Sequence, residues 1–138
     1  MAEHLGPLGV TGCFAGVVTS GSGDSDWRVG LLVVSLAYFY SHYFFASLTA
    51  HVSAMYAPFL AVALALGAPP VATALLLGYF SNLFAALTHY SSGTAAVFFA
   101  PGYVSLGSWW RVGVLLSVMT ITIWLVVGGL WWRVLGLW

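Results

Sequence analysis

The amino-acid sequence predicts an all-α membrane protein. Hydrophobic residues make up 62% of its 138 positions, and charged residues make up only 4%. A soluble domain carries about 25% charged residues, which it needs for a hydrated surface. No aspartate, glutamate, lysine or arginine occurs between Arg28 and Arg111. The interval contains apolar runs close to the roughly 20 residues with which a helix crosses a bilayer.

Composition also argues against several other classes of protein. The formal net charge is zero and lysine is absent, so the chain lacks the basic surface through which proteins bind nucleic acid. Cys13 is the single cysteine, which excludes an internal disulfide. Serine, histidine and aspartate occur without a G-x-S-x-G sequence, and no Cys/His metal-binding spacing is present. We therefore expect no enzyme, no resident metal and no cofactor.

Residues 1–28 are predicted to form a partial membrane or interfacial segment followed by a polar loop. The run Thr19–Asp26 is rich in glycine, serine and aspartate, which favour turns and helix caps. Asp26 is suited to cap the helix that follows. Trp27 and Arg28 suit a position at the membrane interface.

Residues 29–67 are predicted to form a helical hairpin. As one helix, this apolar run would be close to 57 Å long at 1.5 Å per residue, whereas the hydrocarbon core is about 30 Å thick. The helix must therefore break, and the small polar stretch 46–49 is the expected place. Because unpaired polar groups are costly in lipid, the hydroxyls and imidazoles there favour a re-entrant hairpin whose tip is buried in protein.

Residues 70–101 are predicted to form a broken transmembrane helix. Their apolar character is interrupted by the polar stretch Thr88–Thr94 and stops at Pro101. The segment is roughly half again as long as a span requires, so a helix, an unwound middle and a short second helix fit it. Broken helices at mid-membrane are how many secondary transporters build their binding sites.

Residues 109–132 are predicted to form a C-terminal transmembrane helix. Tryptophans beside Arg111 mark one interface, and tryptophans beside Arg133 mark the other. Ser108 is a plausible N-cap. If the hairpin returns to its own side, Arg28 and Arg133 lie on one face of the membrane and Arg111 lies on the opposite face. Three arginines leave open which face is cytoplasmic.

The two polar breaks, residues 41–53 and 88–94, contain hydroxyls and imidazoles but no carboxylate. Hydroxyls, backbone N–H groups and helix N-termini donate hydrogen bonds to anions. We therefore expect the breaks to bind an anionic solute. The site residues expected from this pattern are Ser47, Thr49, His51, Thr88, His89, Ser91, Ser92 and Thr94.

Other interpretations of the same polar residues remain open. Ser47 and Thr49 could bond to their own helix, and histidines could bond to a neighbouring helix. Ser81 and Asn82 favour bonds between helices over a place in the site. Imidazoles can also be axial ligands of haem iron. A small haem-binding or structural membrane subunit is therefore the alternative function.

Several separated motifs resemble the divalent anion:sodium symporter family. They are the run Phe45-Ala46-Ser47-Leu48-Thr49-Ala50-His51, the loop Leu87-Thr88-His89-Tyr90-Ser91-Ser92-Gly93, and Gly102-Tyr103-Val104. The run from Tyr38 to Ser47 and the ending Gly128-Gly129-Leu130-Trp131-Trp132 resemble the plastid 2-oxoglutarate/malate translocators and related bacterial exchangers. The resemblance covers most of the chain from Val29 to Trp138.

The resemblance implies a carrier of dicarboxylates built from two inverted halves, working as a homodimer in a plastid inner envelope or a bacterial inner membrane. Residues 29–138 would be part of the second half, and the first half would be missing, so we expect a C-terminal fragment. Ser47 and Thr49 fall on the serine and threonine of the family's Ser-Asn-Thr tip, but Leu48 replaces its asparagine. Because leucine offers no oxygen to a sodium ion, the resemblance implies sodium-independent exchange of malate for 2-oxoglutarate or a similar acid.

Overall fold

The structure, a computed structural model, describes residues 26–137. The segment expected before residue 26, including most of the polar loop, lies outside the described residues. Every element within them is helical, so the prediction of an all-α fold is confirmed. The helices are α2 (Trp27–Tyr40), η2 (Ser41–Phe44), α3 (Leu48–Ala65), α4 (Pro70–Leu83), η3 (Phe84–Ala86), α5 (Gly93–Phe99), α6 (Leu106–Ile123), η4 (Trp124–Gly128) and α7 (Gly129–Val134).

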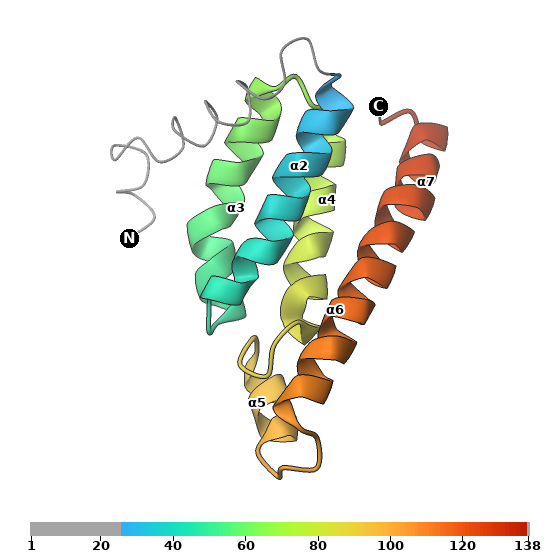
Figure 1. Ribbon diagram of the computed structural model, residues 1–138. Helices are drawn as coiled ribbons and strands as arrows, with labels where there is room; N and C mark the ends of the chain where they lie inside the picture. The colour runs from blue at the N-terminus through green and yellow to red at the C-terminus, as the bar shows by residue number, and fades with distance from the viewer. Residues whose placement is uncertain (1–25, 138) are drawn as a thin grey trace.

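Helices α2 and α3 form a hairpin whose tip points toward the end of the molecule that holds α5 (Figure 1). Asp26 caps α2 as expected, because its side chain accepts a hydrogen bond of 3.3 Å from the backbone N–H of Arg28. The chain leaves the helical conformation at Phe45 and re-enters it after Ser47, so the break overlaps the predicted stretch 46–49 and begins one residue earlier. The break therefore separates two helices that each run the length of the hairpin.

Helix α4 packs beside both arms of the hairpin (Figure 1). The three helices enclose an aromatic core. Pro70 begins α4, where the missing N–H of proline costs nothing. Tyr38 and Phe39 from α2 meet Phe80 from α4 and Phe84 from η3, and all four are fully buried. Large aromatic side chains contribute much of the buried apolar area in such a core. They also bring the end of α4 to the hairpin tip.

The last helix, α6–η4–α7, runs from one end of the molecule to the other (Figure 1). It begins at Leu106, earlier than expected, and Ser105 is its N-cap. The prediction that Ser108 is the cap is therefore wrong: its backbone N–H donates to the Ser105 hydroxyl at 3.2 Å. A serine caps a helix only where the backbone turns out of the helix, and that turn occurs one helical turn earlier.

Two helices of the described region are long and apolar enough to cross a membrane, residues 48–65 and 106–134. At 1.5 Å per residue, the second would be about 43 Å long, which exceeds the hydrocarbon core. Thr120 and Thr122 on it donate to carbonyls of their own helix, at 2.6 and 2.7 Å, as expected. Its outward side chains are mostly apolar, which suits contact with lipid or with further protein.

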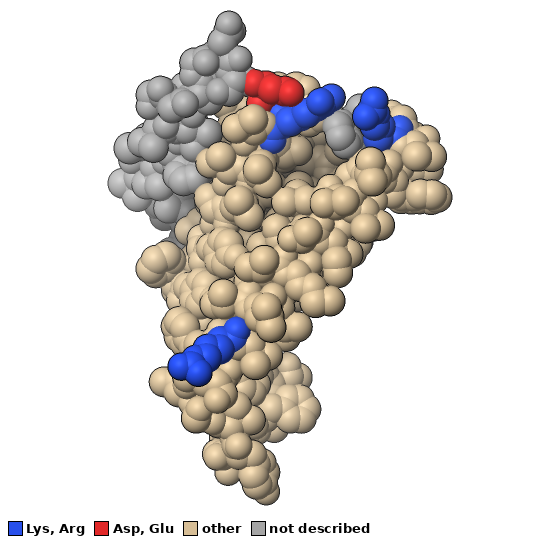
Figure 2. Space-filling model, turned by 45° about the vertical axis from the view of Figure 1, so that its right-hand side comes forward, with Lys and Arg blue, Asp and Glu red and all other residues tan. Residues whose placement is uncertain are grey.

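The arginines lie at two separate levels of the molecule. The start of α2 and the end of α7 lie at the same end, and the start of α6 lies toward the other (Figure 1). Figure 2 shows basic side chains at the upper end and one in the lower half, with an uncharged surface between them. This arrangement agrees with the expected topology, in which Arg28 and Arg133 share one face of the membrane.

Candidate functional site

The hairpin tip presents hydroxyl groups at the first turn of α3. Ser47 is the N-cap of α3, and its side chain accepts a hydrogen bond of 3.3 Å from the backbone N–H of Ala50. Ser47 and Thr49 are both exposed. Leu48 between them is half-buried and packs against the aromatic core. The tip therefore directs two hydroxyls outward and one apolar side chain inward.

Two histidines lie beneath the tip and are fully buried. His51, one turn into α3, is hydrogen-bonded through Nε2 to the Ser41 hydroxyl at 2.8 Å. Its ring stacks on Tyr38, with centroids 4.9 Å apart. His42 lies edge-on to His51 at 5.2 Å and stacks on Phe84 at 4.3 Å. The imidazoles are thus held in an aromatic pocket and do not share the surface with the tip hydroxyls.

The second break follows η3 and ends at α5. Ser91 is buried and donates to the carbonyls of Ala85 and Thr88, the latter at 2.7 Å. Ser92 caps α5, accepting a hydrogen bond of 3.2 Å from the backbone N–H of Ala95. Together these bonds fold the polar stretch into a tight turn.

The surface of this turn carries further polar groups. The Ser92 hydroxyl also bonds the Thr94 hydroxyl at 3.0 Å. His89 is half-buried and packs edge-on against Tyr90 and at a tilt against Phe99. The turn therefore presents the hydroxyls of Ser92 and Thr94 on its outer side.

The two breaks meet. The Tyr90 hydroxyl, in the second break, donates a hydrogen bond of 2.8 Å to the carbonyl of Tyr43, in the first. Phe84, at the start of η3, contacts His42 and His51 at 4.3 and 4.6 Å between ring centroids. Residues separated by more than 40 positions in the chain are thereby joined at one place.

Helix α6 supports this junction from the side. At Gly113 it passes so close to the second break that an added Cβ would lie 2.4 Å from the carbonyl oxygen of Leu87. Tyr43 of the hairpin tip also packs against Trp110, with ring centroids 5.4 Å apart. The tip and the second break therefore lie at the level of the first turns of α6.

The structure places the eight expected site residues at these two breaks, at different depths. Ser47, Thr49 and Thr94 are exposed, His89 and Ser92 are half-buried, and His51, Thr88 and Ser91 are buried. Sequence reasoning did not single out Tyr43 and Tyr90, which join the breaks. Their only signal was their position within the polar stretches. Ser81 bonds the Tyr38 hydroxyl of another helix at 2.7 Å, as expected.

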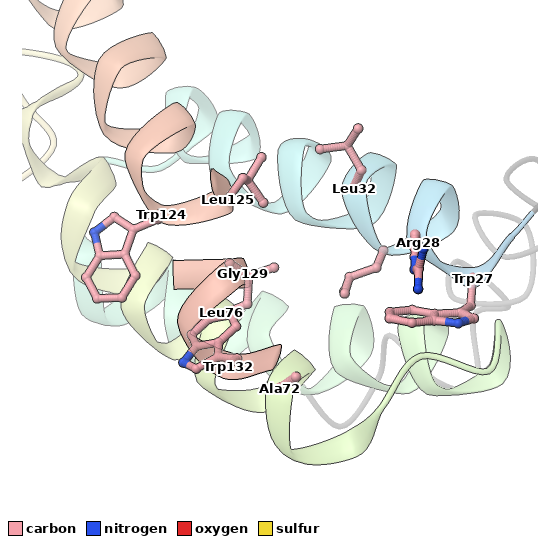
Figure 3. A pocket seen from close by; sticks show the side chains of 10 residues that line it. Trp27, Arg28, Leu32, Ala72, Leu76, Trp124, Leu125, Gly129 and Trp132 are labelled. Atoms are coloured by element: carbon pink, nitrogen blue, oxygen red, sulfur yellow. The ribbon is translucent and has the colours of Figure 1, made fainter. Parts of the chain in front are cut away.

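An apolar cavity of about 230 Å³ lies at the other end of the molecule (Figure 3). It opens between the start of α2, the start of α4 and the end of the last helix. Arg28 lies at its edge, over the ring of Trp27 and 3.8 Å from an Asp26 carboxylate oxygen. The lining is otherwise apolar, with Leu31, Leu32, Ala72, Leu76, Trp124, Leu125, Gly129 and Trp132. Such a lining does not suit a small polar solute, so the breaks are the candidate site.

The family model of the sodium:sulfate symporter transmembrane region matches residues 1–138, the whole chain. The chain belongs to this family. It is therefore an integral membrane protein of a transporter family, and the haem-binding alternative is not favoured. Among the residues that the structure describes, no three histidine, cysteine, aspartate or glutamate side chains gather as a metal site.

The chain is also similar to individual proteins that are named as transporters. The chain is 47% identical to "Dicarboxylate transporter 1, chloroplastic" of Spinacia oleracea, over 100% of the chain and 25% of that protein. It is 51% identical to a Bacillus subtilis (strain 168) protein provisionally named malate transporter YflS, over 100% of the chain and 29% of that protein. It is 31% identical to the "Citrate/succinate antiporter" of Escherichia coli (strain K12), over 28% of that protein. The chain thus spans between a quarter and a third of the length of these curated relatives.

Proposed function

We propose that this chain takes part in transmembrane transport of dicarboxylates and that its two polar breaks hold substrate carboxylates. The observation that carries the proposal is the junction of the breaks. Two hydroxyl-rich stretches distant in sequence are bonded together through Tyr90 and Tyr43. Both stretches lie in a region of the chain without any acidic side chain. The relatives that transport dicarboxylates by name support the same substrate class.

The chemistry of the tip suits an anion. Ser47 and Thr49 expose hydroxyls at the N-terminus of α3, which has 18 residues. Hydroxyls and free backbone N–H groups donate to a carboxylate, and the helix dipole adds positive potential at the same place. Ser92 and Thr94 offer hydroxyls at the second break. His51, Thr88, His89 and Ser91 support these donors from beneath.

We propose further that transport is an exchange, of malate for 2-oxoglutarate or a similar acid, and that it needs no sodium. Sodium sites in transporters with broken helices are built from oxygen ligands. Leu48, at the centre of the tip, offers no side-chain oxygen and packs inward. We place the carrier in a plastid inner envelope or a bacterial inner membrane, as a homodimer.

Counter-exchange of labelled malate in liposomes tests the proposal, with the protein as its gene encodes it. Replacing both tip hydroxyls, Ser47→Ala with Thr49→Ala, should abolish most of the exchange. The matched control is Thr120→Ala with Thr122→Ala, which removes two hydroxyls that bond only their own helix. Full exchange by the tip variant would refute the site. Exchange that stops in sodium-free buffer would refute the sodium independence alone.

A further inference from the structure

His42 is a polar side chain that the proposed function does not use. It lies in η2, between α2 and the hairpin tip, and is fully buried. Its ring is stacked on Phe84 at 26° between ring planes and lies edge-on to His51. Phe84 therefore covers one face of the ring, and the ring nitrogens lie at its edge.

The ring nitrogens of His42 lack hydrogen bonds. Within the described residues, neither Nδ1 nor Nε2 has a partner of acceptable geometry. A buried polar atom without a partner destabilises the folded protein, and a phenylalanine would fill the same aromatic slot without that cost. Unsatisfied buried groups are rare in folded proteins, and each one calls for an explanation. Packing alone does not explain a histidine here.

The position of His42 next to the second break suggests why a histidine stands there. His42 precedes Tyr43 and Ser91 follows Tyr90, and because Tyr90 is hydrogen-bonded to Tyr43, His42 lies near the Ser91 backbone in the second break. Two further buried atoms at this junction also lack partners in the described region, Nδ1 of His51 and Oγ1 of Thr88. The Tyr90 hydroxyl already bonds the breaks at one point. His42 is thus at a second point of contact between them, where polar atoms are unpaired on both sides.

We propose that His42 is a positioning residue for the substrate site, whose ring nitrogens pair with the turn 88–91 and hold it against the hairpin tip when substrate is bound. The inference rests on the proposed function. Because His42 is enclosed, it does not touch the substrate. A substrate that bridges the breaks draws the Ser91 backbone onto the ring, and pairing of the unsatisfied atoms stabilises the bound state. This difference between the two states is what a change in affinity requires.

The test is His42→Phe, which keeps the stacked ring and removes its nitrogens. Thermal stability in detergent should stay the same or rise, because two unpaired buried atoms are lost. The KM for malate should rise roughly 2- to 13-fold, which corresponds to one hydrogen bond of ordinary strength. With saturating malate in nanodiscs, the backbone amides of residues 88–91 should also exchange hydrogen faster in His42→Phe than in the native protein. His42→Gln, which restores an amide donor, should recover part of the KM.

Two matched controls remove other buried hydroxyls without partners in the described region, Ser35→Ala on α2 and Thr73→Val on α4. Neither should change the KM or the exchange of residues 88–91. An unchanged KM for His42→Phe with unchanged amide exchange would overturn the inference, leaving His42 as core packing. Equal losses of stability and transport, without recovery by His42→Gln, would overturn it as well.

Failure of the proposed function would be distinguishable from failure of this inference. If the native protein moved no dicarboxylate, the proposed function would fall. Hydrogen exchange at residues 88–91 with malate bound would then decide the positioning role by itself: faster exchange in His42→Phe than in the native protein supports it, and equal exchange refutes it.

Discussion

Helix α6 supports the second break at one glycine, and replacing that glycine should separate the two. In Gly113→Ala, the new Cβ would lie 2.4 Å from the carbonyl oxygen and 3.2 Å from the carbonyl carbon of Leu87. Real Cβ atoms essentially never approach another heavy atom within 3.0 Å. The helix or the break must therefore move by at least about 0.6 Å. The obstacle is backbone, so no side chain can rotate away.

The expected cost follows from overpacking, which destabilises a protein by about 1–3 kcal/mol. Alanine also gains about 1 kcal/mol over glycine in a helix interior, so a control must cancel that gain. Gly78→Ala on α4 is such a control, because nothing lies within 4 Å of its added Cβ. We expect Gly113→Ala to be about 1–3 kcal/mol less stable than Gly78→Ala.

Reversible unfolding in mixed detergent micelles measures this difference, and malate exchange in liposomes measures its effect on the site. Because the displaced backbone precedes the turn at residues 88–91, Gly113→Ala should also weaken transport. Equal stability of Gly113→Ala and Gly78→Ala, with unchanged transport, would refute the close approach of α6 to Leu87.

Three further predictions concern the breaks and the last helix. Tyr90→Phe removes the bond to the hairpin tip and should cost about 1 kcal/mol of stability, measured by the same unfolding assay; an unchanged value would mean that this bond does not hold the breaks together. Ser105→Ala should destabilise α6 by about 1 kcal/mol, and Ser108→Ala should cost clearly less; the reverse order would restore Ser108 as the cap. In a Cys13→Ser background, Ala46→Cys should react with a membrane-impermeant thiol reagent from one side only, and labelling from neither side would place the tip in lipid.

Much of the fold could be predicted from the sequence because its signals are local. The scarcity of charge between Arg28 and Arg111 indicates a membrane protein without reference to any contact. The excess length of the run 29–67 requires a break, and the small polar residues show where it lies. Asp26 caps α2 because a capping bond spans only two residues. The cap of α6 was misplaced because two serines compete and backbone direction decides between them.

The site could be predicted only in part. The polar stretches are visible in the sequence, but the depth of each residue is not. Ser47 and Thr49 are exposed whereas His51, two positions later, is fully buried. Successive positions on a helix point in different directions, and neighbouring helices decide which direction is covered. Here Tyr38 of α2 and Phe84 of η3 cover the side of His51.

The sequence by itself determined that this protein is helical, lies in a membrane and is interrupted by two polar stretches free of carboxylates. These properties depend on residue types within one stretch, so they need no knowledge of neighbours. Only the tertiary structure decided that Tyr90 bonds Tyr43 and that His42 is enclosed against Phe84. Such contacts join positions far apart in the chain. Their existence depends on how the helices pack, because the packing sets which side chains of distant segments come within bonding distance.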